Sequence, residues 1–166
     1  MLISLEEMPE ALRSRVGDLR GIVRFALDEF ATEHRHLRHR YSTRTEASII
    51  HDNMVWYAKE KGFQWKLRRN LFLFSVGQDF RVKPKRLSKN FQTSNIQTRL
   101  VLQFEDQRKL RLFDNMDLTN VFLGYQCDGV EVAKWSIWLV EPDAKRVKWA
   151  AELTSGEGTA TVTVAV

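Results

Sequence analysis

The sequence has little cysteine, little proline and no long apolar segment. Its single cysteine, Cys127, excludes an intramolecular disulfide and a zinc ribbon. No apolar run approaches the roughly 18–20 residues that are needed to span a bilayer. Residues 1–15 also lack the basic and apolar regions of a secretory signal. We therefore expect a cytoplasmic protein that does not associate with a membrane.

The sequence signatures of common enzyme classes are also missing. The chain contains no Walker loop, no GxGxxG, HExxH or GxSxG motif and no pair of CxxC motifs. We therefore expect no cofactor. The sequence leaves open whether the protein is an enzyme, and the missing motifs favour a non-catalytic role.

The chain does contain enough apolar material for one packed domain. Its 166 residues are 43% hydrophobic and include five tryptophans, which argues against global disorder. We predict a single domain over residues 1–153, with a helical part at 1–61 and a β-rich part at 63–153. Residues 154–166 are predicted to be a tail, either an added edge strand or a flexible end.

The first part has the apolar spacing of helices. Apolar residues recur every three or four positions from Leu5 to Phe30, which predicts one helix that reaches about His39 or breaks near residues 31–32. Such a long helix could also mediate a homodimer through its outer turns. A second helix is expected from Thr43 to about residue 61, because Thr43-Arg44-Thr45-Glu46 has capping-box spacing and a glycine follows at 62.

After residue 62 the apolar period changes to two, which is typical of strands. Strands are expected at Trp65–Arg68, Leu71–Val76, Phe80–Lys83, Thr119–Cys127, Val130–Val140 and Val147–Leu153. Pro84 predicts that the third of these is an edge strand or ends there, and turns are expected at 128–129 and 141–143. Residues 96–105 fit either a strand or a short helix. The predicted fold class is α+β, an N-terminal helical hairpin packed on a mostly antiparallel β-sheet.

Basic residues are concentrated in one segment. Residues 61–90 hold nine lysines and arginines against Asp79 alone, whereas residues 1–30, 31–60 and 91–166 carry net charges of −2, +1 and −2. This concentration favours a patch that binds nucleic acid, either DNA or RNA, although lysines on an edge strand also deter aggregation. The predicted contacts are Lys66, Arg68, Arg69, Arg81, Lys83, Lys85, Arg86, Lys89 and Asn95.

The four histidines lie within residues 34–53, a segment that is also rich in arginine. In a helix, His34 would point away from His36 and His39, and the surrounding arginines would repel a cation, so we expect no metal site. The arginines suit either a solvated helix end or a turn that contacts phosphate.

His51 is different, because it lies at the rim of the apolar stripe of the second predicted helix. A half-buried structural histidine is the simpler interpretation. The alternative is a nuclease-type effector that cleaves RNA or DNA, with His51 as general base and Arg40 or Arg44 holding a phosphate. A third interpretation is a protein-interaction module whose basic face binds an acidic partner.

Four sequence blocks, RYSTRTEASIIHDNM, RNLFLFSVGQDFRVKPKRL, TSNIQT and LGYQCD, together resemble a family of uncharacterised bacterial proteins from mobile or accessory regions. The resemblance covers about residues 37–153 and brings no activity or catalytic residue with it. It implies a prokaryotic accessory protein of a toxin–antitoxin-like or phage-defence locus. Together with the charge distribution, it favours a non-catalytic nucleic-acid-binding or regulatory protein.

Overall fold

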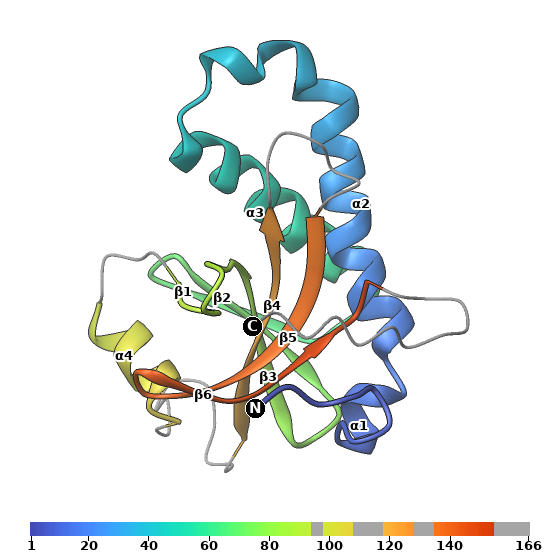
Figure 1. The fold of residues 1–166 in the computed structure, drawn as a ribbon, viewed down its shortest axis with the longest axis vertical. Coiled ribbons are helices and arrows are strands. Elements are labelled where there is room, and N and C mark those ends of the chain that lie inside the picture. Colours follow the sequence, from blue (N-terminus) through green and yellow to red (C-terminus); the bar gives the residue numbers. More distant parts are fainter. Residues whose placement is uncertain (94–97, 108–117, 128–134, 155–166) are drawn as a thin grey trace.

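The computed structural model describes residues 1–93, 98–107, 118–127 and 135–154, except for the side chain of Arg68. Two long helices lie against one face of a six-stranded, mostly antiparallel sheet (Figure 1). This arrangement confirms the predicted α+β class. Within the described ranges, no helix has the length and apolar character that crossing a membrane requires.

The N-terminal helical region is divided into more elements than the sequence predicts. Its elements are α1 (Glu10–Arg13), α2 (Val16–His34), a 3₁₀ helix η1 (Arg35–Arg40) and α3 (Thr43–Glu60). The prediction of one long helix is wrong, because the chain leaves helical geometry at Arg15, where φ is −112° and ψ is 11°. Leu12 and Val16, on the two sides of this break, are both buried.

The start of α3 differs by one residue from the predicted cap. Ser42, rather than Thr43, is the N-cap, and its Oγ accepts a hydrogen bond of 3.1 Å from the backbone N–H of Thr45. Glu46 does not close a capping box and instead pairs with Arg38 of η1, at 2.9 and 3.0 Å. The helix is followed, as expected, by Gly62 in the left-handed region at φ 78°.

The sheet has its strands in sequence order. They are β1 (Trp65–Arg68), β2 (Leu71–Val76), β3 (Phe80–Arg86), β4 (Thr119–Cys127), β5 (Trp135–Asp143) and β6 (Arg146–Glu152). β3 and β4 are parallel and the other neighbouring pairs are antiparallel. A short helix, α4 (Arg99–Glu105), precedes β4, so the ambiguous segment is helical from residue 99 onward, and residues 96–97 lie outside the described ranges.

The two faces of the sheet have separate apolar layers. Trp135, Ile137 and Leu139 of β5 pack toward α2 and α3, as their alternation predicts. On the opposite face, Phe104 of α4 packs with Phe122 of β4 and others. The sheet is therefore covered on both sides, with the hairpin on one and α4 on the other.

Pro84 lies inside β3, which is an interior strand, so the predicted edge position is wrong. The last residues that pair between β2 and β3 are Phe74 and Val82. Pro84 lies beyond this point, where β2 no longer runs beside β3, so its missing N–H removes no hydrogen bond from the β2–β3 ladder.

The predicted turn at 141–143 is also wrong. β5 continues to Asp143 through an irregularity between Glu141 and Pro142, and the turn to β6 contains Ala144 at φ 52°. The predicted turn at 128–129 and the tail from residue 155 lie outside the described residues.

Candidate nucleic-acid interface

The cations predicted to form one basic face are separated in the structure. Arg81 is only 3% exposed, and its Nε donates a 2.8 Å hydrogen bond to Oδ1 of Asn120 on β4. The amide of Asn120 in turn donates to the carbonyl of Phe104 on α4, at 2.9 Å. Arg81 therefore joins β3, β4 and α4 and does not face solvent, as a contact in the predicted basic patch would.

Lys83 is also buried, at 7% exposure, on the sheet face that α4 covers. Its Nζ lies 5.8 Å from the centroid of the Phe104 ring. The pKa of Lys83 is lowered to about 8, mainly by burial; the charge of Lys85 adds to the lowering and the charge of Glu105 opposes it. Burial likewise lowers the pKa of the half-buried Lys85. These two lysines are therefore poor contacts for a phosphate that approaches from solvent.

The remaining predicted contacts are spread over the molecule. Arg86 is half-buried and donates from Nη2 to Sγ of Cys127, at 2.9 Å. Lys66 lies in the outer strand β1 and Arg69 follows that strand, and both are exposed. Lys89 is exposed after β3 and lines a pocket. Asn95 and the side chain of Arg68 lie outside the described residues.

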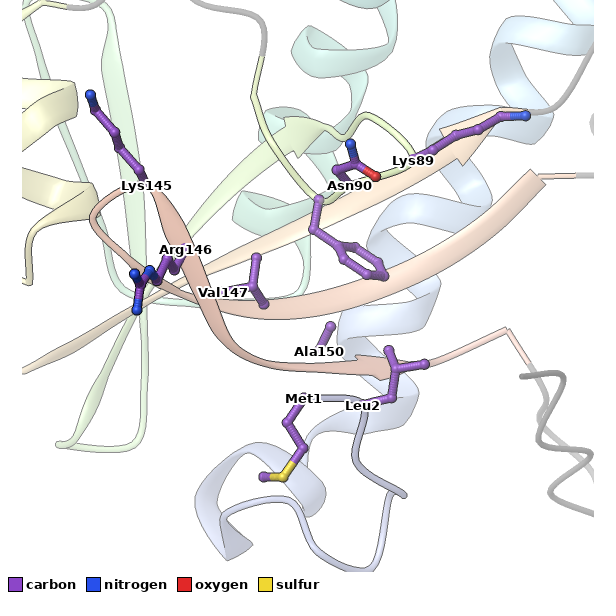
Figure 2. A pocket seen from close by; sticks show the side chains of 9 residues that line it. Met1, Leu2, Lys89, Asn90, Lys145, Arg146, Val147 and Ala150 are labelled. Carbon is purple, nitrogen blue, oxygen red and sulfur yellow. The ribbon is translucent and has the colours of Figure 1, made fainter. Parts of the chain in front are cut away.

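The pocket has a volume of about 550 Å³ and lies beside the β5–β6 hairpin (Figure 2). Lys145 and Arg146 stand at one end and Lys89 at the other, with Val147 and Ala150 between them (Figure 2). The lining also includes Met1, Leu2, Asn90 and Phe91. The described residues that line the pocket thus include three cationic side chains and no carboxylate.

A tight turn after β3 places Phe91 at this pocket. The N–H groups of Phe91 and Gln92 donate to the carbonyl and the Oγ of Ser88, at 2.9 and 3.0 Å. The turn holds Phe91 at φ 59°, a conformation that is strained for a residue with a bulky side chain. The ring is half-buried and meets Trp138 edge to face, with centroids 4.8 Å apart. A rigid aromatic surface is therefore positioned among the cations.

The β5–β6 turn supplies the other two cations. Ala144 takes a positive φ of 52°, and its N–H donates to the carbonyl of Glu105 at the end of α4, at 3.0 Å. This bond anchors the turn to α4, and Lys145 and Arg146 follow directly with exposed side chains. Neither residue was among the predicted contacts. The β5–β6 turn is the sequence signal that could have indicated them. The sequence places that turn at 141–143, because of Pro142, whereas the observed turn begins at Ala144.

The histidine segment shows a local packing role for His34. Its Nδ1 is hydrogen-bonded to the hydroxyl of Tyr41, at 3.0 Å, and its ring stacks on Phe30 with centroids 5.7 Å apart. His36 and His39 are exposed on η1. Across the part of the chain that the structure describes, no group of three or more histidine, cysteine or acidic side chains is placed to hold a metal ion.

His51 is half-buried on α3, next to the exposed Asp52. Burial is the main cause that lowers the pKa of His51, Asp52 opposes it, and the charge of Lys85 adds to the lowering. The Nδ1–Oδ1 distance to Asp52 is 3.6 Å, longer than a good hydrogen bond. Arg44 lies two helical turns earlier on the same side of α3, and Arg40 is exposed at the end of η1. The nuclease alternative stays a prediction.

Comparisons with protein-family models, with curated proteins and with solved structures find no match for this chain. The basic pocket is therefore the feature on which a functional proposal rests.

Proposed function

We propose that this protein binds single-stranded nucleic acid without cleaving it, and that the basic pocket is the centre of the interface. The observation that carries the proposal is the combination of a fixed aromatic ring with Lys89, Lys145 and Arg146. Unpaired bases stack on aromatic side chains, while lysine and arginine neutralise the neighbouring phosphates. A regulatory role at a toxin–antitoxin-like or phage-defence locus is part of the proposal and comes from the family resemblance.

The shape of the pocket favours a single strand over a duplex. Its volume of about 550 Å³ lies in the range of pockets that enclose a small molecule or one unpaired base. The cations stand at its two ends and apolar side chains lie between them (Figure 2). A single strand can place a base over the apolar centre and a phosphate at each end. A duplex keeps its bases stacked inside and would contact the cations alone.

Binding of a labelled single-stranded oligonucleotide, measured by fluorescence anisotropy at low salt, tests the proposal. The double variant Lys145→Ala/Arg146→Ala should weaken binding at least about tenfold, because two phosphate contacts are removed. The matched control Arg35→Ala/Arg40→Ala removes the same charge from exposed residues of η1, at the far end of the hairpin (Figure 1), and should change binding less than about threefold. Equal losses in both variants would contradict a localised interface.

The aromatic contribution is tested separately by Phe91→Leu. Base stacking on one aromatic side chain contributes about 1–3 kcal/mol, so this variant should bind the oligonucleotide at least about fivefold more weakly. The same substitution should leave binding of a polyphosphate chain unchanged, because that ligand has charge but no base. A parallel loss for both ligands would show that Phe91 acts by shaping the pocket rather than by stacking.

A further inference from the structure

The outer strand β1 carries exposed apolar side chains on the helix face of the sheet. Trp65 is 44% exposed and Leu67 is 61% exposed. Their partners in the register are Phe74 and Phe72, which belong to the core beneath α2 and α3. The apolar layer of the helix face therefore continues onto β1 and reaches solvent there.

Trp65 and Leu67 direct their backbone groups to the side of β1 where no other described strand pairs. The N–H of Ser75 donates to the carbonyl of Gln64 at 2.8 Å, which makes these residues a hydrogen-bonded pair across the β1–β2 ladder. Hydrogen-bonded and non-hydrogen-bonded pairs alternate in an antiparallel ladder. Lys66 is therefore bonded to β2, whereas the N–H and C=O groups of Trp65 and Leu67 point away from it. Among the described strands, β1 is the outermost on this side.

The described residues at this edge include three cations. Lys66 is exposed on the sheet face opposite Trp65 and Leu67, and Arg69 follows directly after the strand. Nζ of Lys59 lies 4.0 Å from the centroid of the Trp65 ring. A second copy of the chain that paired through the same strand would bring its own β1 cations onto the face that carries Lys66, and like charges that face each other are destabilising. An acidic strand would be attracted instead.

We propose that β1 is the docking edge for an extended acidic segment of another protein, which pairs with it as an additional strand. Its apolar side chains would alternate with carboxylates, because neighbouring residues of a strand point to opposite faces. The apolar positions would cover Trp65 and Leu67, and the acidic positions would face Lys66. This mode of recognition takes its affinity from main-chain hydrogen bonds and its specificity from alternate side chains. It goes beyond the nucleic-acid pocket and does not depend on it.

The test uses three labelled peptides with the full chain and fluorescence anisotropy. One alternates glutamate and valine, one alternates lysine and valine, and one has the acidic composition with its valines in a block. We expect the alternating acidic peptide to bind at least about tenfold more tightly than either of the others. Equal binding of the acidic and basic alternating peptides would overturn the proposal, and so would equal binding of the alternating and block peptides.

Leu67→Pro removes an outward-facing backbone N–H together with the leucine side chain, so any loss of binding beyond that of Leu67→Ala is the backbone contribution. Proline is tolerated on an edge strand where the N–H faces outward, so circular dichroism should show a folded protein while binding of the acidic peptide falls at least about tenfold. Retained binding by a folded Leu67→Pro variant would overturn the proposal. If the Leu67→Pro variant does not fold, Lys66→Glu provides the test. This variant should prefer the basic alternating peptide over the acidic one, and an unchanged preference for the acidic peptide would overturn the proposal.

Leu67→Ala and Leu102→Ala provide a matched pair, because both leucines are exposed and Leu102 lies on α4, away from this edge. Only the first should weaken peptide binding. The pocket variant Lys145→Ala/Arg146→Ala should leave peptide binding unchanged, which separates a failure of this proposal from a failure of the proposed function. If the unliganded chain dimerises and Leu67→Pro abolishes the dimer, the β1 edge binds a second copy of the chain and the proposal is overturned.

Discussion

At the scale of single residues, Lys83 carries an ammonium group into the space between the sheet and α4. Burial lowers the pKa of this lysine from 10.5 to about 8. Below pH 8 the group is protonated in both the folded and the unfolded chain, so the cost of burying its charge is fully present. Between about pH 8 and 10.5 the unfolded chain holds more protons, and the free energy of unfolding rises with pH.

Lys83→Met should therefore stabilise the protein at pH 7 by roughly 1–3 kcal/mol, since it removes the buried charge and keeps an unbranched side chain of similar length. The advantage should shrink as the pH rises through 8 and vanish near 10.5. Urea denaturation of the wild-type protein and of Lys83→Met between pH 7 and 10.5 measures this difference in the free energy of unfolding. Lys145→Met, at an exposed lysine, should change the free energy of unfolding by less than about 0.5 kcal/mol. An advantage that persists at pH 10.5 would contradict the burial of a charged group.

The ion pair between Arg38 and Glu46 links η1 to α3. The Glu46 carboxylate accepts two hydrogen bonds from the Arg38 guanidinium, which lies 5.4 Å from the centroid of the Trp135 ring. Glu46 is buried, and removing one partner of a buried ion pair is destabilising, because the other charge loses that partner while it stays largely out of water. Glu46→Gln should lower the free energy of unfolding by about 2–4 kcal/mol. Glu60→Gln, at an exposed glutamate of the same helix, is the control and should have an effect below about 0.5 kcal/mol.

At the scale of elements, β4 approaches the end of β3 and the segment after it so closely that only glycine fits at position 124. A Cβ there would lie 2.4 Å from the Lys85 carbonyl oxygen and 2.6 Å from Cγ of Leu87. The first contact is with backbone, which cannot move aside without disturbing the parallel β3–β4 pairing. Gly124→Ala should therefore lower the free energy of unfolding by about 2 kcal/mol or more.

Gly17→Ala in α2 is the matched control for this substitution. A Cβ at position 17 has nothing within 4 Å, and alanine is the better helix former. The variant should therefore be stabilised by about 0.5 kcal/mol. Thermal unfolding measures both effects. A shift of the melting temperature in the same direction for Gly124→Ala and Gly17→Ala would contradict the close approach of β4 to β3.

Elements whose pattern is local could be predicted from the sequence. The bounds of β1, β2 and β4 match the prediction because alternation and turn residues delimit them. The break before α2 could not be predicted, since the apolar spacing continues across Arg15 without interruption. The interior position of β3 depends on parallel pairing with β4, which begins more than thirty residues later. That pairing is set by α4 and the shared core rather than by local sequence.

The basic segment, residues 61–90, shows that the candidate site could not be predicted from local sequence either. A run of nine cations in residues 61–90 suggested one surface, yet strand alternation and burial place Arg81 and Lys83 beneath α4 and leave Lys66 at the opposite edge from Lys89. Charge counting along the chain cannot show which cations become neighbours. Lys89 lines the same pocket as Lys145 and Arg146, which lie in a segment of net negative charge.

At the scale of the whole molecule, the pocket and the β1 edge lie at opposite ends of the sheet. The pocket is beside the β5–β6 hairpin, and β1 is at the other end of the strand order. The two proposed partners, a single-stranded nucleic acid and an acidic protein segment, would therefore bind at the same time without contact. A chain that bound both proposed partners would suit the proposed regulatory role.

The salt dependence of oligonucleotide binding tests the central claim most directly. Each phosphate neutralised on a single strand contributes about 0.7 to the slope of log K against log salt concentration. Contacts from Lys89, Lys145 and Arg146 predict a slope of about −2 for the wild-type chain and about −0.7 for Lys145→Ala/Arg146→Ala. An unchanged slope in this double variant would contradict the basic pocket as the nucleic-acid interface.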